Sequence, residues 1–156
     1  MTTPNSVKYT TIWTPQVGAQ LDAIMCTWCP ELLYGGARGG GKTDFLLGDY
    51  YQDVIEYGQY WRGIVFRRTL PELDDIIARS LELFEQTGAD YSKTKKLWTF
   101  KNGATLRFRH LERDEDAQKY QGHAYTWIGF DEVGNFPSAD PVFKIFATLR
   151  SAHNVE

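Results

Sequence analysis

The sequence predicts an α/β domain in which helices flank a mainly parallel β-sheet. The first observation behind this prediction is a glycine-rich stretch at 35–43, which lies between a short apolar run and a helical stretch. The second is an apolar run at 63–66 that is followed by helical periodicity, and the third is an apolar run at 125–130. Strands that alternate with helices are typical of a parallel sheet. At 156 residues, the chain is long enough for one domain with its own core.

A helix is expected from Pro15 to about Cys26, because proline suits the first turn of a helix and Thr14 can cap it. Its buried side would carry the apolar residues Val17, Leu21, Ile24 and Met25. Gln16 lies one residue inside this helix. Two interpretations stay open for Gln16: it reads the edge of an adenine base, as in many ATP-driven nucleic-acid enzymes, or it is a surface side chain.

Cys26 and Cys29 form a C-x-x-C pair near the end of that helix. The functional interpretations of such a pair are a redox couple or half of a zinc site. A zinc site would need a second pair of ligands, and the three histidines are far apart in the sequence. We therefore expect two thiols at the end of a helix.

The glycine-rich stretch fits the phosphate-loop pattern G-x-x-x-x-G-K-[ST] without a mismatch. The pattern comprises Gly36, Ala37, Arg38, Gly39, Gly40, Gly41, Lys42 and Thr43. The apolar run at 32–34 before it is expected to be a strand, and residues 44–51 after it are expected to be a helix. This is the context that the pattern needs, although a glycine-rich turn can also fit it by chance.

Each part of this pattern has a physical role in phosphate binding. Glycines let successive backbone N–H groups turn inward, and the N-terminus of the following helix adds partial positive charge. Lys42 can reach the β- and γ-phosphates, and the hydroxyl of Thr43 can ligate Mg²⁺. The pattern therefore predicts the phosphates of a nucleotide and Mg²⁺ as ligands, and the resemblance described below implies that the nucleotide is ATP.

The run at 63–66 predicts a buried strand that ends in Arg67 and Arg68. Ligands bind at the C-terminal edge of strands in open α/β sheets, so these arginines could face phosphate, DNA or a neighbouring subunit. A solvated turn is the alternative. A helix is expected next, from Pro71 to about Glu85, because its apolar residues follow helical spacing, and Gly88 is a plausible stop.

A β-hairpin is predicted near residues 96–109, because two strand-like runs flank the turn signal Asn102-Gly103. In the second run, apolar residues alternate with Arg107 and Arg109, which predicts one buried and one basic face. The basic face could meet DNA, act on a neighbouring subunit or simply be solvated. Residues 112–119 are highly charged and predict a short exposed helix or loop.

The run at 125–130 predicts a strand that ends in Asp131 and Glu132. At the end of a strand beside the phosphate-loop strand, Asp131 would be placed to hold Mg²⁺, and Glu132 could polarise an attacking water. Residues 141–149 are expected to be helical or to pass from helix to strand.

Composition limits the classes of protein that the chain can belong to. Hydrophobic residues make up 42% and charged residues 24%, as in an ordinary globular protein. The net charge of −3 carries no overall nucleic-acid signature, although a local basic patch remains possible. Because the sequence shows no membrane-span run and no signal peptide, we expect an intracellular protein with no membrane partner that is not secreted.

Together these residues resemble the N-terminal ATPase region of the large terminase subunit of tailed phages, the motor that packages DNA into procapsids. The resemblance rests on segments 14–16, 36–43, 65–69, 119–122, 130–132 and 147–150. An arginine inside the phosphate loop, as at Arg38, is typical of these motors.

The resemblance implies a RecA-like (ASCE) P-loop ATPase fold over residues 1–156, with Glu132 as catalytic glutamate and Lys42 and Arg38 assisting. It implies double-stranded DNA, a portal protein and a small terminase subunit as partners, a homo-oligomeric ring when assembled, and the host cell cytoplasm as location. An arginine from a neighbour would complete each site, with Arg67, Arg68, Arg107 and Arg109 as candidates. Full-length members also carry a C-terminal nuclease domain, and we expect this chain to be a truncated form without one.

Other classes of function share the phosphate loop. One is a nucleotide-binding fragment of another nucleic-acid motor, such as a helicase-like protein, without turnover of its own. Another is a small-molecule kinase, although kinases exclude water, and a water-activating Asp131-Glu132 pair is out of place in them.

Overall fold

The computed structural model describes residues 11–36, 39, 41–150 and 155. The α-helices are α1 (Ala19–Ile24), α2 (Lys42–Gln52), α3 (Val54–Tyr57), α4 (Leu70–Phe84) and α5 (Asp140–Phe146). The strands are β1 (Arg62–Arg67), β2 (Asp90–Ser92), β3 (Leu97–Thr99), β4 (Thr105–His110) and β5 (Trp127–Phe130). Short 3₁₀ helices are η1 (Gly58–Tyr60), η2 (Glu85–Thr87), η3 (Asp114–Tyr120) and η4 (Val133–Asn135).

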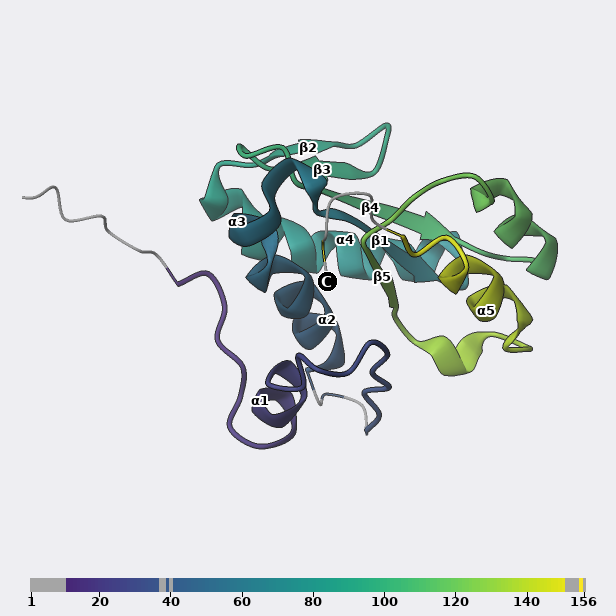
Figure 1. The fold of residues 1–156 in the computed structure, drawn as a ribbon, viewed down its shortest axis with the longest axis horizontal. Helices are drawn as coiled ribbons and strands as arrows, with labels where there is room; N and C mark the ends of the chain where they lie inside the picture. The colour runs from purple at the N-terminus through teal and green to yellow at the C-terminus, as the bar shows by residue number, and fades with distance from the viewer. Residues whose placement is uncertain (1–10, 37–38, 40, 151–154, 156) are drawn as a thin grey trace, which may run out of the picture.

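The five strands form one mixed sheet in the order β2-β3-β4-β1-β5 (Figure 1). β1 pairs in parallel with both β4 and β5, whereas β2, β3 and β4 pair antiparallel. The α/β class is therefore confirmed, but the sheet is mixed rather than mainly parallel. β5, which carries Asp131 at its end, lies beside β1 and not beside a phosphate-loop strand.

Two hydrophobic cores lie on the two faces of the sheet. The larger core joins α2, α4 and the hairpin to the face of β1 that carries Val65. The smaller core forms on the face that carries Ile64 and Phe66, where η3 and α5 cover the sheet. The central strand β1 is buried on both faces. Its packing therefore fixes the position of the chain that leaves the strand after Arg67.

The helix predicted at 71–85 is confirmed as α4, and its N-terminus shows why the helix begins there. Thr69 accepts a hydrogen bond from the backbone N–H of Glu72, and the Glu72 carboxylate accepts one from the Thr69 backbone. This reciprocal capping box satisfies two backbone donors that a helix start leaves unpaired. The helical stretch continues past α4 as η2 and ends at Gly88, whose left-handed φ of 70° confirms it as the stop.

The hairpin at 96–109 is also confirmed, as β3 and β4. Asn102 accepts a hydrogen bond from the Ala104 backbone and donates one to the carbonyl of Val54, which ties the turn to α3. Trp98 is only 1% exposed, and its indole N–H donates to the hydroxyl of Ser80 on α4. The hairpin is therefore anchored on the helical layer.

The strand predicted at 32–34 is wrong: these residues have no regular secondary structure. Leu32 and Leu33 are 45% and 81% exposed, and Tyr34 stacks on Phe45 of α2. A parallel strand is held by hydrogen bonds to a neighbour, and in the described part of the chain the sheet ends at β5 without including this segment.

The N-terminal helix is shorter than predicted. α1 covers only Ala19–Ile24, after Gly18 with a φ of 101° that a regular helix cannot contain. Val17 and Met25 are 94% and 67% exposed, so the expected apolar face is not buried. The buried residue of α1 is Gln20 instead.

The remaining predictions concern smaller features. Residues 114–120 form the short helix η3, and the bridge between Tyr125 and Leu149 follows α5, as a helix-to-strand passage would require. Cys26 and Cys29 are free thiols. No helix within the described residues is long and apolar enough to cross a membrane.

Candidate nucleotide site

The glycine-rich loop enters α2 through a left-handed residue. Gly41, with a φ of 66°, is the N-cap of α2, and Gly39 has a φ of 79°. Side chains rarely adopt this conformation, which explains why glycine is needed at both positions. Gly36 begins the described part of the loop, whereas Ala37, Arg38 and Gly40 lie outside the described residues.

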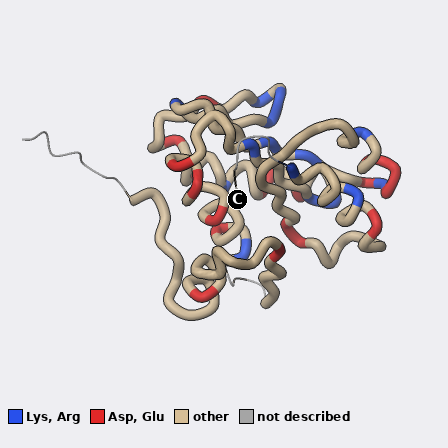
Figure 2. The backbone as a smooth tube through the Cα atoms, viewed as in Figure 1, with Lys and Arg blue, Asp and Glu red and all other residues tan. Residues whose placement is uncertain are grey.

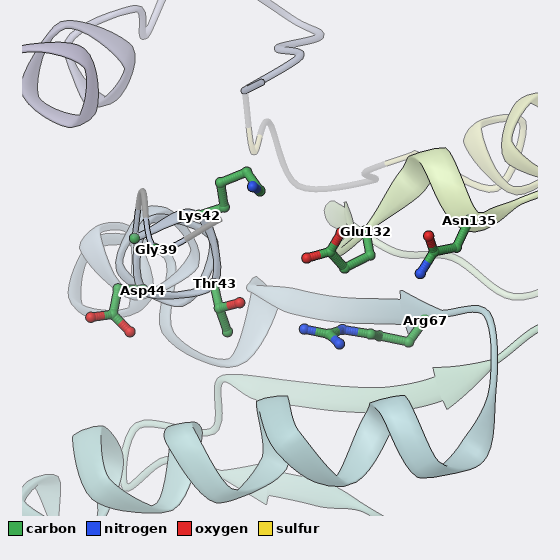
Figure 3. Close-up of a pocket in the computed structure, with 8 residues that line it drawn as sticks. Gly39, Lys42, Thr43, Asp44, Arg67, Glu132 and Asn135 are labelled. Atoms are coloured by element: carbon green, nitrogen blue, oxygen red, sulfur yellow. The ribbon is translucent and has the colours of Figure 1, made fainter. Parts of the chain in front are cut away.

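Lys42 lies at the first position of α2, at the mouth of the loop. Its ammonium Nζ donates a hydrogen bond of 3.0 Å to the carbonyl oxygen of Gly36. The lysine therefore crosses over the loop and faces the cavity that the loop borders (Figure 3). An ammonium in that place can bind phosphate oxygens.

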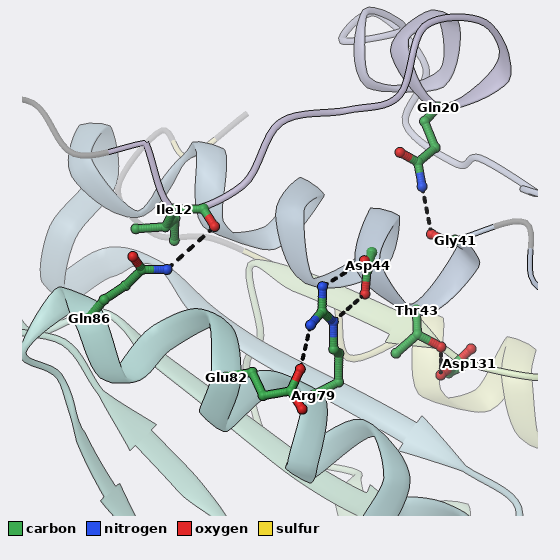
Figure 4. Close-up of polar contacts among 9 residues, drawn as sticks. All are labelled: Ile12, Gln20, Gly41, Thr43, Asp44, Arg79, Glu82, Gln86 and Asp131. Carbon is green, nitrogen blue, oxygen red and sulfur yellow. Dashed lines mark hydrogen bonds and ion pairs between the residues drawn. The ribbon is translucent and has the colours of Figure 1, made fainter.

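The loop and the end of β5 meet through two side chains that are 88 residues apart. The Thr43 hydroxyl donates a hydrogen bond of 3.0 Å to Oδ2 of Asp131 (Figure 4). Asp131 is only 4% exposed. The predicted metal ligands Thr43 and Asp131 therefore lie together, as the phosphate-loop interpretation requires.

These two oxygens fit Mg²⁺, which typically takes one or two protein ligands and completes its shell with phosphate oxygens and water. Among the described residues, no group of three or more His, Cys, Asp or Glu side chains could hold a metal ion.

Arg67 forms the closest contact to Asp131. Its Nε and Nη2 donate hydrogen bonds of 3.0 and 2.5 Å to the same Oδ2 that accepts from Thr43. The two side chains are 9% and 4% exposed, so the pair is buried. The end of β1 places the Arg67 guanidinium against the Asp131 carboxylate at the end of the adjacent strand. The interpretation of Arg67 as part of a solvated turn is therefore wrong.

Glu132 leaves the sheet in a left-handed conformation, with a φ of 53°. Its backbone N–H donates to Oδ1 of Asp131, and its exposed side chain points into the cavity. Left-handed non-glycine residues are uncommon and concentrate at functional sites. The turn gives the two carboxylates different surroundings, because Asp131 is buried while Glu132 is exposed.

These groups line a cavity of about 560 Å³, which is large enough for a nucleotide triphosphate tail. Its lining comprises Gly39, Gly41, Lys42, Thr43, Asp44, Arg67, Glu132 and Asn135 (Figure 3). Asn135 was not predicted; it comes from η4 and donates to the Glu72 carboxylate of the α4 cap. Nothing in the local sequence pattern distinguishes it from an ordinary turn asparagine.

Gln20 is an upstream glutamine that touches the loop, a contact that the sequence analysis did not predict. Its Nε2 donates a hydrogen bond of 2.8 Å to the carbonyl of Gly41 (Figure 4). Its Oε1 accepts a hydrogen bond from the backbone N–H of Gln16. Gln16 itself is exposed. A second contact that sequence reasoning missed is the paired hydrogen bond from Arg79 on α4 to Asp44 on α2.

The other candidate arginines do not line the cavity. Arg68 donates to the carbonyl of Leu111 and lies over the ring of Phe136. Arg107 and Arg109 lie on β4, where Arg109 donates to the carbonyl of Lys95. Burial, together with the charge of Arg107, lowers the pKa of Arg109.

The fold and the cavity together define an α/β protein with a candidate nucleotide site between α2, β1 and β5. A family model described as "Terminase large subunit, T4likevirus-type, N-terminal" matches residues 33–151, which is well over half of the chain. The chain therefore belongs to the terminase large subunit family, and the resemblance drawn from the motifs is confirmed. No curated protein and no solved structure matches the chain.

Proposed function

We propose that this domain is a RecA-like P-loop ATPase that hydrolyses ATP to drive double-stranded DNA into a procapsid. The observation that carries the proposal is the 3.0 Å hydrogen bond between Thr43 and Asp131, in a cavity that Lys42 and Glu132 also line. Family membership supports the link to DNA packaging. It also supports a portal protein, a small terminase subunit and a ring of identical subunits as partners in the host cytoplasm.

The side chains divide the reaction among them. Lys42 would bind the β- and γ-phosphates, and Thr43 with Asp131 would hold Mg²⁺, which neutralises phosphate charge when bound. Glu132 would accept the proton of the attacking water, because its carboxylate is exposed to the cavity. Since Arg67 is paired within its own chain, Arg68, Arg107 and Arg109 remain as candidates for the arginine that acts on a neighbour.

Phosphate release with and without DNA, together with nucleotide titration, tests the proposal. Lys42→Ala should weaken ATP binding roughly 10- to 100-fold, because a charge-assisted contact to the phosphates is lost. Lys144→Ala, which removes an exposed lysine of α5, is the matched control. Equal ATP affinity in the Lys42 and Lys144 variants would refute the phosphate-loop assignment.

A basic segment at 91–111 supports contact with DNA. It contains six Lys and Arg residues and no Asp or Glu, in a chain whose net charge is −3. Figure 2 shows Lys and Arg gathered at the β2–β3 connection. Such a cluster suits the phosphate backbone of a duplex, which attracts cations regardless of sequence.

Charge reversal tests this surface. Lys93→Glu with Lys95→Glu should weaken duplex binding and lower the slope of log affinity against log salt by about 2. Lys144→Glu is the matched control, since that lysine lies on α5. If the double variant keeps the wild-type slope, the segment does not bind DNA.

A further inference from the structure

We propose that Arg67 is the resident counter-cation of Asp131, and that it exchanges from this carboxylate to the terminal phosphate when a metal–nucleotide complex binds. This inference rests on the proposed function, because it needs a nucleotide in the cavity. It goes further by assigning Arg67 a cis role at the site, where it senses the third phosphate.

The first argument is the crowding of one oxygen. Oδ2 of Asp131 accepts three hydrogen bonds: one from Thr43 at 3.0 Å, and two from Arg67 at 3.0 and 2.5 Å. Oδ1 accepts a hydrogen bond of 3.1 Å from the backbone N–H of Glu132. Oδ2, the oxygen beside Thr43, therefore has no lone pair left for a cation unless one of its three donors moves away.

The second argument is charge. A divalent cation held by Thr43 and Asp131, directly or through water, would take the place of the guanidinium beside Oδ2. The cation and the Arg67 guanidinium, both beside the same oxygen, would repel each other strongly, because water screens charges poorly in a buried site. Either the metal stays out or Arg67 moves away from Oδ2.

The third argument is where Arg67 can go. A buried guanidinium needs an anionic partner, because an unpaired buried charge is costly. Arg67 already lines the cavity with Lys42, Gly39 and Gly41, which border the predicted position of the phosphates. Figure 3 shows the guanidinium extending along the cavity toward Thr43. When the metal takes Asp131 as its ligand, Arg67 loses its anionic partner. The oxygens of a γ-phosphate would then take the place of Asp131 as the partner of Arg67.

This exchange makes two predictions that differ from those of a merely structural ion pair. Metal alone must compete with Arg67, so the wild-type chain should bind it weakly. ADP with metal displaces Arg67 without offering a terminal phosphate, whereas a non-hydrolysable ATP analogue with metal offers one. The wild type should therefore favour the triphosphate, and removal of Arg67 should reduce that preference, leaving the part that Lys42 contributes.

The test compares Arg67→Gln with Arg62→Gln, whose arginine is exposed at the opposite end of the same strand β1. Binding of Mn²⁺ alone, followed by electron paramagnetic resonance, should tighten about tenfold or more in Arg67→Gln and stay at the wild-type value in Arg62→Gln. The ratio of dissociation constants for Mg-ADP and Mg-AMP-PNP should fall about tenfold or more in Arg67→Gln only. General destabilisation would weaken both nucleotides together and leave the ratio unchanged, which would overturn the inference.

A wild-type measurement guards against failure of Arg67→Gln to fold. The ¹⁵Nε resonance of Arg67, assigned with the Arg67→Lys variant, should shift on addition of Mg-AMP-PNP but not of metal-free AMP-PNP. No shift with bound Mg-AMP-PNP overturns the exchange while the proposed function stands. If the folded wild type binds no nucleotide under any condition, the proposed function fails as well.

Discussion

The two ends of the sheet differ in how their contacts are assembled. At the hairpin end, β2, β3 and β4 are neighbours in sequence, and Trp98 and Phe100 fill the larger core. At the β5 end, the polar groups come from distant segments, since Thr43 and Arg67 reach Asp131 across 88 and 64 residues. Apolar burial stabilises the first end, whereas the second holds a buried ion pair that stabilises little by itself. The polar groups of the site are thus gathered at the β5 end, although the smaller core also packs there.

The largest effect on stability is expected from removing Trp98, the side chain that anchors the hairpin on α4. Trp98→Ala should lower the free energy of unfolding by about 3–5 kcal/mol, because it opens a cavity in the core and leaves the Ser80 hydroxyl without its indole partner. Urea denaturation measures the loss. Trp28→Ala, at a tryptophan that is 79% exposed, is the control and should change stability little. A loss below about 1 kcal/mol in Trp98→Ala would mean that the hairpin is not a stability element.

A change at Glu132 should have the opposite effect: it should lower ATP turnover and leave the free energy of unfolding unchanged. Glu132→Gln should lower ATP turnover by roughly 10² or more, because the amide keeps the shape of the side chain but cannot accept a proton. Its unfolding free energy and nucleotide affinity should stay near the wild-type values, since the side chain is exposed. Steady-state phosphate release in an active assembly gives the rate, with Glu112→Gln as control. A wild-type rate in Glu132→Gln would remove Glu132 from the mechanism.

The smallest effect concerns the acidic residues of α2 and α3, which contrast with the basic hairpin. Burial raises the pKa of Asp53 to about 6, and the charges of Asp49 and Glu56 add to this shift. Because the folded pKa exceeds the ordinary value of 3.8, the folded chain holds this proton more tightly than the unfolded chain. The resulting stability is complete below about pH 4 and is lost as the pH rises through about 6.

Asp53→Asn should remove this pH dependence. At pH 7–8 the variant should be more stable than the wild type by up to roughly 1 kcal/mol, after allowance for solvent screening of a half-buried group. Below about pH 4 the two proteins should be equally stable. Thermal unfolding across this pH range measures the difference. A constant gap at every pH would indicate that packing, rather than ionisation, separates the two proteins.

The sequence predicted those parts of the molecule whose causes are local. Asn102-Gly103 specifies a turn by its own backbone preferences, and the capping of α4 at Thr69 lies within four residues. The strand at 32–34 failed because strand formation depends on a neighbour that the segment itself cannot specify. The helix at 15–26 failed at Gly18, where a single left-handed residue outweighs the apolar spacing around it.

The same distinction applies to the site. Gly41, Lys42 and Thr43 were predictable because the loop pattern carries its own geometry, and the end of β5 at Asp131 follows from an apolar run. The pairing of Arg67 with Asp131 was not predictable, because nothing in either strand says that β1 and β5 are adjacent. Gln20 was missed for a related reason: one turn of chain decides which of two glutamines faces the loop.

Segment 11–20 can also be considered as a mechanical element. It contacts η2, where Gln86 donates a hydrogen bond of 3.5 Å to the Ile12 carbonyl. It then crosses α2, where the ring of Trp13 lies against Gly48, and ends at Gly41 through Gln20. A pulling force applied upstream of Ile12 would therefore be transmitted along segment 11–20. The last contact in this series is the hydrogen bond from Gln20 to Gly41 of the phosphate loop (Figure 4). The 3.5 Å hydrogen bond between Gln86 and Ile12 would break first, and the 2.8 Å hydrogen bond between Gln20 and Gly41 would break last. A moderate force would therefore detach the start of segment 11–20 while its contact with the phosphate loop remained intact.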